Sequence, residues 1–416
     1  MLLDNAKFRH IFADKYPLIL IDEYQDSYSP IIEQFIKFFI SEKCGPQFGF
    51  FGDAWQTIYQ SNKACGAIEH DNLYVIKKGS NFRSAPRIVQ FLNEIRSDLK
   101  QTSAIDDFHG EVIAITCDDY KGVRRTDRNF KGELPLDVLK ERLNKVTEKI
   151  KQKTNVEETL KVLMITHKVL AAQQGYETLL NILNDGLRDK EDPFLLFFID
   201  MVEPIYYALK SSNMQLLFDT LGIKRYPITK KSEKSQWKSL ERLLDEKRTE
   251  RVIDIFEAII NTKLIPIPPK LDSWYHLYKS SPETLYTSDT SIQSFFNLDY
   301  SQFIAAKDFL RPEAQFSTEH GVKGEEYDNV ILVIGKGWNQ YQFEVYAPMI
   351  NGSIPVPEGK EASFERNRNL FYVCCSRPKK RLILFVTIPI DDTFKEFLRN
   401  LIGSENIFTY NNFIDT

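Results

Sequence analysis

Long hydrophobic runs and paired cysteines are both missing from this sequence. The apolar run Phe194–Ile199 is among the longest and is far shorter than the roughly 20 residues of a membrane-spanning helix. The five cysteines form no Cys-x-x-Cys pair and the six histidines no His-x3-His pair, which excludes a disulfide framework and the commonest zinc sites. The N-terminal residues also lack a signal-peptide pattern. These absences predict a reduced, cytoplasmic protein.

A charge excess, internal repeats and low-complexity segments are missing as well. Lys and Arg number 54 and Asp and Glu 58, a net charge of -4, which excludes a globally basic nucleic-acid coat but allows a locally basic track. With 43% hydrophobic and 27% charged residues, the chain is not mostly disordered. Aromatic residues, including 30 Phe, are plentiful enough for large cores and for base stacking. Its 416 residues predict two or three domains.

The first hundred residues alternate between short apolar runs and helical patterns. The runs Tyr16–Ile21, Phe48–Phe51 and Leu73–Ile76 are typical of strands buried on both faces. Pro30–Ile40 and Pro86–Ile95 carry apolar residues at helical spacing. This alternation predicts an α/β fold with a parallel sheet, in which ligands bind at the carboxyl ends of the strands.

The alternation returns later in the chain, around a stretch of different character. Further strands are predicted at Gly110–Ile115, Val162–Thr166, Val330–Ile334 and Arg381–Val386, with a helix from about Leu136. Between the second and third of these strands the patterns are mainly helical. We therefore expect a second α/β unit that begins near Val162 and is interrupted by a helical insertion.

Small polar groups follow the first two predicted strands. In Asp22–Asp26, one carboxylate can hold Mg²⁺ while its neighbour takes a proton from an attacking water. Gly52–Tyr59 follows the next strand, and the parallel topology places both segments at the same edge of the sheet. Taken singly, each segment also has a simpler explanation than a binding site: a solvated loop for the first and a capped turn for the second.

Three further segments place basic residues near predicted strands or helices. Asn81–Pro86 puts Arg83 just before a helix, and arginine is the preferred residue for the transition-state charge of a phosphoryl group. Thr318–Tyr327 has glycines beside lysine and histidine, which suits close backbone approach to phosphates. In Arg366–Arg377 the last arginine lies just past an apolar run. A surface arginine or a basic edge strand is the simpler interpretation of each one alone.

In this order and spacing, the five segments resemble motifs II to VI of the superfamily 1 DNA helicases of the UvrD/Rep/PcrA type. DEYQD resembles the Walker B motif II, GDAWQTIY motif III, NFRS motif IV, TEHGVKGEEYDNV motif V and RNLFYVCCSRPKKRL motif VI. The resemblance covers most of residues 16–97 and 310–390. It implies an ATP-dependent 3′→5′ helicase or translocase that uses ATP and Mg²⁺ and acts on single-stranded or 3′-tailed duplex DNA.

The resemblance also implies a domain organisation of two RecA-like parallel-sheet domains with ATP between them. Residues 1–100 would form a first domain that lacks its N-terminal part and carries motifs II to IV. Residues 101–174 would link to and begin the second domain, and residues 309–416 would complete it with motifs V and VI. Residues 175–308 match only by position, as the helical insertion of the second domain.

Each residue that matches a motif inherits an expected role from the family. Asp22 would bind Mg²⁺, and Glu23 would activate the hydrolytic water. The γ-phosphate would be contacted by Gln56, Arg83 and Arg377, and the rest of the nucleotide by Phe82 on the adenine, Gly324 near the phosphates and Glu326 on the ribose. The DNA contacts would be Tyr59, which stacks on a base, with Thr318, His320 and Lys323.

The sequence departs from the family at its front. The phosphate-binding loop G-x-x-x-x-G-K-[ST] and the adenine-binding glutamine motif of the family are missing, since motif II begins at residue 22 and no G-K-[ST] occurs in the chain. The segment Gln60–Ala64 also lacks a stacking ring that the family usually has. The chain alone is therefore expected to show no appreciable ATP turnover.

Two explanations of the missing loop stay open. The chain is a fragment of a longer helicase, or it is a complete protein that has lost turnover and serves as a DNA-binding or regulatory subunit. The first is favoured because the hydrolytic residues Asp22, Glu23, Gln56, Arg83 and Arg377 are retained. From the short stretch after Arg377, we expect no fused nuclease domain. A compact helicase can instead work with a separate nuclease, as in Gabija-type antiphage systems, which pair a small UvrD-like helicase with an Old-family nuclease. DNA repair and antiphage defence are both open as its role.

Overall fold

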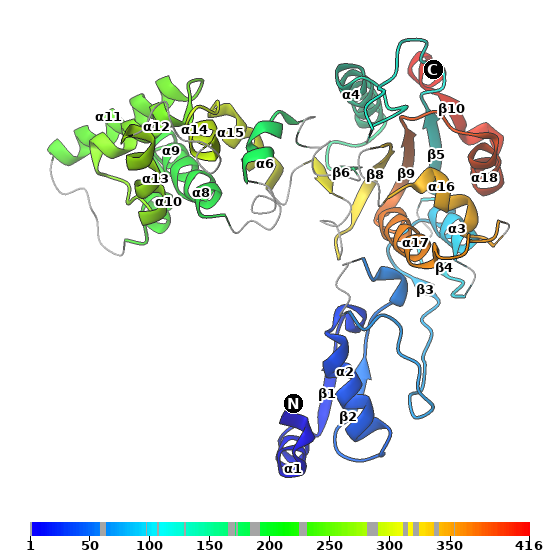
Figure 1. The fold of residues 1–416 in the computed structure, drawn as a ribbon. Helices are drawn as coiled ribbons and strands as arrows, with labels where there is room; N and C mark the ends of the chain where they lie inside the picture. The colour runs from blue at the N-terminus through cyan, green and yellow to red at the C-terminus, as the bar shows by residue number, and fades with distance from the viewer. Residues whose placement is uncertain are drawn as a thin grey trace. The chain divides into compact units, whose positions relative to one another are not determined.

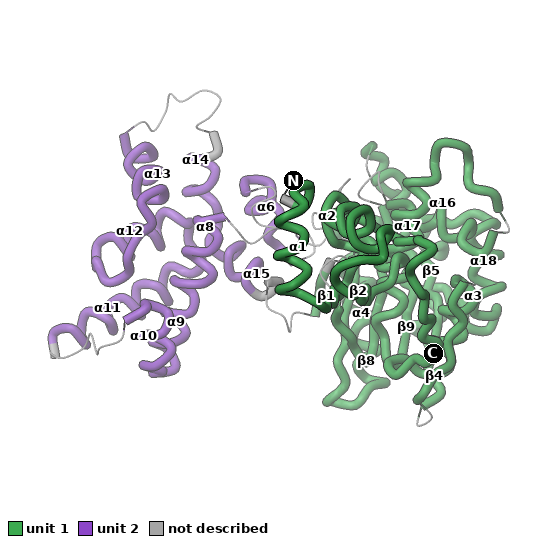
Figure 2. The backbone as a smooth tube through the Cα atoms, turned by 90° about the horizontal axis from the view of Figure 1, so that it is seen from below, with its two compact units in different colours: residues 1–166, 315–416 green, residues 167–314 purple. Residues whose placement is uncertain are grey.

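The computed structural model describes residues 2–58, 64–96, 98–105, 108–128, 130–164, 171, 174–183, 192–223, 231–280, 290–310, 315–318, 324–336, 341–352 and 354–416. The chain forms two compact units, shown in different colours in Figure 2. Unit 1 comprises residues 1–166 and 315–416, and unit 2 comprises residues 167–314.

The strands of unit 1 form parallel sheets (Figure 1). The largest sheet has the strand order β10-β5-β9-β8-β6-β7, and each described pair in it is parallel. Its strands are β5 (Glu111–Thr116), β6 (Leu160–Met164), β7 (Phe316–Thr318), β8 (Tyr327–Ile334), β9 (Pro378–Val386) and β10 (Ile407–Thr409). The smaller sheets pair β1 (Leu18–Ile21) with β2 (Gln47–Phe50) and β3 (Ser80–Asn81) with β4 (Thr102–Ser103), again in parallel. The predicted α/β class with parallel sheets is confirmed.

Helices cover the six-stranded sheet because its central strands are apolar on both faces. Alternate residues of β8, Val330, Leu332 and Ile334, share one core with helices α3 (Pro86–Ile95) and α17 (Glu361–Cys375). Helix α3 is thus packed on this sheet, whereas the motif order had grouped residues 1–100 with the first RecA-like domain.

The other helices of unit 1 are α1 (Ala6–Lys15), α2 (Ser29–Phe35), α4 (Leu136–Gln152), α16 (Phe343–Tyr346), α18 (Asp392–Ile402) and α19 (Tyr410–Asp415). Short helical turns are η1 (Leu2–Asp4), η2 (Tyr24–Asp26), η3 (Ile36–Ile40), η4 (Ala54–Gln56), η7 (Ala347–Met349) and η8 (Ser404–Asn406).

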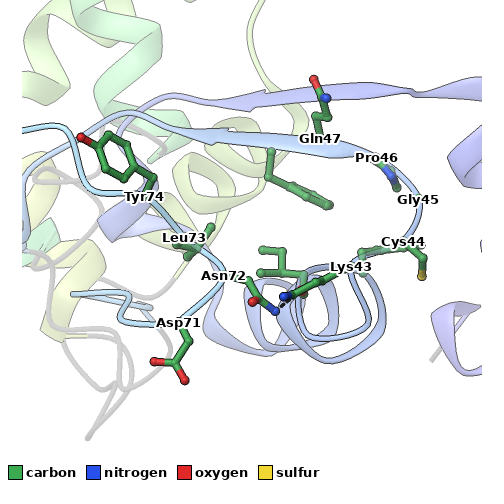
Figure 3. Close-up of a pocket in the computed structure, with 12 residues that line it drawn as sticks. Lys43, Cys44, Gly45, Pro46, Gln47, Asp71, Asn72, Leu73 and Tyr74 are labelled. Carbon is green, nitrogen blue, oxygen red and sulfur yellow. Dashed lines mark hydrogen bonds between the residues drawn. The ribbon is translucent and has the colours of Figure 1, made fainter.

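Aromatic side chains pack on one face of the two-stranded sheet β1-β2. The ring centroids of Phe35 and Phe39 lie 5.1 Å and 6.1 Å from that of Phe48 on β2. On the other face, Leu18 and Leu20 remain 56% and 60% exposed. Beside β2, a groove of about 820 Å³ is lined by residues 39–40, 43–48 and 71–74 (Figure 3).

The predicted strand Leu73–Ile76 is wrong, because the described residues 71–79 contain no strand. Tyr74, Val75 and Ile76 are instead exposed by 90%, 68% and 68%. A β-branched, apolar run becomes a strand only where a neighbouring strand accepts its backbone hydrogen bonds, and no described strand does so here.

Unit 2 is built from helices in its described part. They are α6 (Glu177–Leu183), α8 (Pro193–Leu196), η5 (Phe197–Val202), α9 (Glu203–Lys210), α10 (Met214–Leu221), α11 (Lys231–Lys247), α12 (Val252–Thr262), α13 (Pro269–Ser280), α14 (Thr290–Phe296) and α15 (Ser301–Leu310). Their core is rich in phenylalanine, with Phe198, Phe256, Phe295 and Phe303 fully buried. In the part of the chain that is described, no helix has both the length and the apolar character needed to cross a bilayer.

Candidate active site

Two exposed carboxylates follow strand β1 at its carboxyl end. Asp22 and Glu23 come directly after Ile21, which pairs with Phe50 of β2. The Glu23 backbone N–H donates a hydrogen bond to Oδ1 of Asp22 at 3.0 Å, and Glu23 has a left-handed backbone with φ 47°. This tight turn keeps both side chains at the edge where parallel sheets bind their ligands.

A buried glutamine ties this turn to the segment after β2. Nε2 of Gln25 donates to Oε2 of Glu23 at 2.5 Å, and its Oε1 accepts the backbone N–H of Asp53 at 3.1 Å. The side chain is fully buried, so it orients the Glu23 carboxylate as well as linking the two segments. Gly52 allows this arrangement, since a Cβ atom there would lie 2.1 Å from Gln25 Oε1.

Gly52→Ala is therefore expected to displace Gln25 and to lower the free energy of unfolding by about 1–3 kcal/mol, because buried polar atoms lose their partners. Thermal unfolding of the variant measures this loss. Gly79→Ala is the matched control, because a Cβ atom there would meet only Lys100 O at 3.4 Å. Equal stability of the two variants would contradict the role given to Gly52.

The turn η4 lies against helix α17. Asp53 Oδ1 caps the turn by accepting the Trp55 backbone N–H at 3.0 Å, and Oδ2 accepts Nε2 of Gln56 at 3.4 Å. From α17, Nδ2 of Asn369 donates to the backbone oxygens of Thr57 at 3.0 Å and Ala54 at 3.4 Å. Motif III is thus hydrogen-bonded to motif VI.

Arg377 is a buried cation whose described hydrogen bonds go only to neutral oxygens. Its guanidinium is 1% exposed and donates to Val373 O at 2.9 Å, Glu325 O at 3.2 Å, Ser376 Oγ at 2.8 Å and Gln56 Oε1 at 3.5 Å. Burial, and then the neighbouring Arg83, lower its pKa to about 10, so the charge remains at neutral pH. A buried charge of this kind favours the binding of an anion.

Arg83 and Glu326 meet beside Arg377. Nε of Arg83 lies 3.2 Å from Oε2 of Glu326, and its Nη1 donates to Ser376 O at 3.3 Å. Lys379 Nζ lies 2.5 Å from the other carboxylate oxygen. The hydrogen bond from Lys379, followed by that from Arg83, holds the pKa of Glu326 below its usual value.

The structure brings the predicted residues Gln56, Arg83, Glu326 and Arg377 together through this hydrogen-bonded network. The Phe82 ring, predicted to stack on adenine, is 78% exposed. Gly324 has φ +83°, and a Cβ atom there would meet no described atom within 4 Å. Tyr59, His320 and Lys323 lie outside the described residues, as does the side chain of Thr318, which ends strand β7.

The residues of this site allow a magnesium nucleotide. No three His, Cys, Asp or Glu side chains converge among the described residues, but Mg²⁺ bound with a nucleotide needs only one or two carboxylates beside phosphates and waters. Asp22 fits this requirement, because it is exposed and lies at the carboxyl end of β1.

Sequence reasoning missed four residues that organise the site. Gln25, Asn369 and Tyr372 lie inside recognised motifs, so their position was a usable signal. Arg96 lies outside the motifs, yet its Nη1 is 2.6 Å from Oδ2 of Asp53. No feature of the sequence near Arg96 indicates this contact.

A protein-family model indicates the class of protein that the chain resembles. Residues 1–68 match the family described as UvrD/REP helicase N-terminal domain. Together with the relatives below, this match confirms the resemblance to the UvrD-like helicases that the motifs indicated.

Two curated proteins are similar to the chain. The Gabija protein GajB of Bacillus cereus (strain HuB5-5) is 25% identical over 455 residues, which cover 95% of this chain and 62% of GajB. The mitochondrial ATP-dependent DNA helicase HMI1 of Saccharomyces cerevisiae is 33% identical over 118 residues, 25% of this chain and 15% of HMI1. The chain therefore spans less than two thirds of the length of either relative.

Proposed function

We propose that the chain works as part of an ATP-dependent 3′→5′ DNA helicase or translocase, with the γ-phosphate of ATP bound at Gln56, Arg83 and Arg377. The observation that carries this proposal is the buried Arg377 guanidinium with its neutral acceptors. A γ-phosphate would supply a negative charge that none of these hydrogen-bond acceptors carries. The likeness to helicases supports the same assignment.

Glu23 is the proposed general base of hydrolysis. Gln25 donates to one of its carboxylate oxygens, which fixes the orientation from which the carboxylate accepts the proton of the attacking water. Asp22 would hold Mg²⁺ together with the phosphates. When bound there, the ion offsets the charge that develops on the phosphoryl oxygens.

The Arg83–Glu326 pair is suited to exchange partners when the nucleotide binds. Its two side chains are 33% and 45% exposed, and ion pairs this accessible to water contribute little to stability. Arg83 is then available to the γ-phosphate, and Glu326 to the ribose. The exposed ring of Phe82 can receive the adenine.

Single-stranded DNA or a 3′-tailed duplex is the proposed track. Tyr59, Thr318, His320 and Lys323 are its proposed contacts, carried over from the family motifs. Closure of the RecA-like domains on ATP and their opening on product release would step the strand along. The proposed domains are those that the motifs indicate, with residues 175–308 as the helical insertion of the second.

A second candidate is a helicase-like subunit without turnover, acting in antiphage defence beside a separate nuclease. The observation that favours it is the likeness to a Gabija protein over 95% of the chain. The coding DNA immediately upstream of Met1 distinguishes the candidates. An in-frame phosphate loop there supports hydrolysis, whereas a stop codon and a ribosome-binding site support the subunit without turnover.

Glu23→Gln tests the proposed mechanism in protein made from the whole open reading frame. Loss of the general base is expected to reduce DNA-stimulated ATP turnover by about 10²–10⁴-fold while a fluorescent ATP analogue binds with unchanged affinity. Glu42→Gln, an exposed carboxylate on the turn after η3, is the matched control. Near-normal turnover of Glu23→Gln would show that another group is the base.

A further inference from the structure

Arg96 connects three parts of unit 1 through one buried guanidinium. It follows the last residue of α3 and is 6% exposed. Its Nη1 lies 2.6 Å from Asp53 Oδ2 and 3.2 Å from the Tyr372 hydroxyl, and its Nε lies 3.1 Å from Asp98 Oδ1. Motif III, helix α17 and the segment after α3 are thereby joined at a single side chain.

Aromatic rings fix the plane of this guanidinium. It lies 5.1 Å from the ring centroid of Trp55 and 5.1 Å from that of Tyr372, and these two rings meet edge to face at 5.4 Å. Contacts of this type favour a delocalised, planar cation over an ammonium. Trp55 lies inside the turn η4, so the stacking also restrains the turn.

Helix α3 has an arginine near each of its ends. Arg83 precedes the helix and donates to Ser376 O, immediately before Arg377, while Arg96 follows the helix and reaches Tyr372. The same Arg96 holds Asp53, the residue that caps the turn of Gln56 and accepts from its side chain. The position of Gln56 relative to Arg377 therefore depends on Arg96.

We propose that Arg96 is a positioning residue that fixes the turn Ala54–Gln56 against helix α17 and so sets Gln56 beside Arg377. The inference rests on the proposed function only in that Gln56 and Arg377 are taken as γ-phosphate contacts. Arg96 itself touches neither nucleotide nor water in this role. Its planar fork makes three contacts at once, which a lysine cannot reproduce.

The charge of the Arg96 guanidinium is consistent with a fixed, ion-paired role. Burial acts to lower the pKa of its guanidinium, but the hydrogen bond and charge of Asp53, together with the hydrogen bond to Asp98, raise the pKa overall. The side chain is thus permanently charged. Arg377 is its opposite, since its pKa is lowered by burial without a carboxylate in its hydrogen bonds.

Hydrogen exchange on the full chain tests the proposal without nucleotide. Arg96→Lys keeps a cation opposite Asp53 and is expected to unfold at a temperature close to the wild type. Its amides at residues 52–58 are nevertheless expected to exchange about ten-fold faster, because the contacts with Tyr372 and Asp98 are lost. Arg87→Lys, on the same helix but bonded to Gln90 and Ile402, is expected to leave this exchange unchanged.

The lysine variant separates positioning from simple charge pairing. If Arg96→Lys protects residues 52–58 as the wild type does, or if Arg87→Lys loosens them equally, the proposal is overturned. Arg96→Met extends the series and is expected to loosen the same amides further. Should that variant fail to fold, Arg96→Lys alone decides the outcome.

A kinetic measurement distinguishes this inference from the proposed function. In protein that hydrolyses ATP, Arg96→Lys is expected to lower kcat while KM for ATP stays within about two-fold, because the misplaced Gln56 acts in the transition state. A raised KM with unchanged kcat would count against the positioning role. If no preparation hydrolyses ATP, the proposed function fails, and the exchange result still stands by itself.

Discussion

Glu203→Gln is expected to lower the free energy of unfolding of residues 167–314 by about 3–5 kcal/mol, because it leaves buried cations without their carboxylate. Glu203 is fully buried at the start of α9. Its Oε1 accepts from Arg248 at 2.7 Å and from the Tyr300 hydroxyl at 2.9 Å, and its Oε2 from Arg248 at 2.9 Å and Lys307 at 3.3 Å. A neutral amide can accept at only one of these positions and offers no balancing charge.

Urea unfolding followed by the fluorescence of Trp237 and Trp274, both in unit 2, measures this loss. Glu246→Gln is the matched control. Its ion pair with Arg242 is 3.5 Å long and exposed on both sides, so its removal is expected to change stability by less than about 1 kcal/mol. If the two variants lose similar amounts, Glu203 does not organise the core of this unit.

Local sequence patterns predicted the parts of the fold whose burial follows from the segment itself. Helix α3 begins at Pro86 and ends at Ile95, as its spacing predicts, because a proline at the first turn and one apolar face define it. The run Val330–Ile334 likewise lies within β8. Leu73–Ile76 has the same character but no described neighbouring strand, and a strand depends on a partner that its own sequence does not specify.

The candidate site also has a part that the sequence predicted and a part that depends on distant contacts. The motifs singled out Gln56, Arg83, Glu326 and Arg377, whose residue type and place at element ends are visible in the sequence. The contacts that hold them were not visible, since Arg96 and Tyr372 are 276 positions apart. Only packing of α3 and η4 on α17 brings such residues together, so long-range positioning had to come from the structure.

Arg377→Met is expected to change stability and activity in opposite directions. Methionine fills much of the same volume without the cost of burying a charge, so the free energy of unfolding is expected to rise. If Arg377 neutralises the γ-phosphate, ATP turnover is expected to fall by about 10³–10⁵-fold. A site that binds an anion would thus reduce the stability of the empty protein, the trade-off expected of functional residues.

Thermal unfolding of Arg377→Met beside Arg142→Met tests the stability half of this argument. Arg142 is also largely buried, but its Nη1 lies 2.9 Å from Oδ1 of Asp119, so its loss leaves a carboxylate unpaired and is expected to destabilise the chain. Opposite signs for the two variants would show that the neutral acceptors of Arg377 do not offset the cost of burying its charge. If both variants are destabilised alike, the neutral acceptors around Arg377 already satisfy it, and its burial does not indicate an anion site. Because this comparison needs no nucleotide, it examines the basis of the proposed site even where turnover is absent.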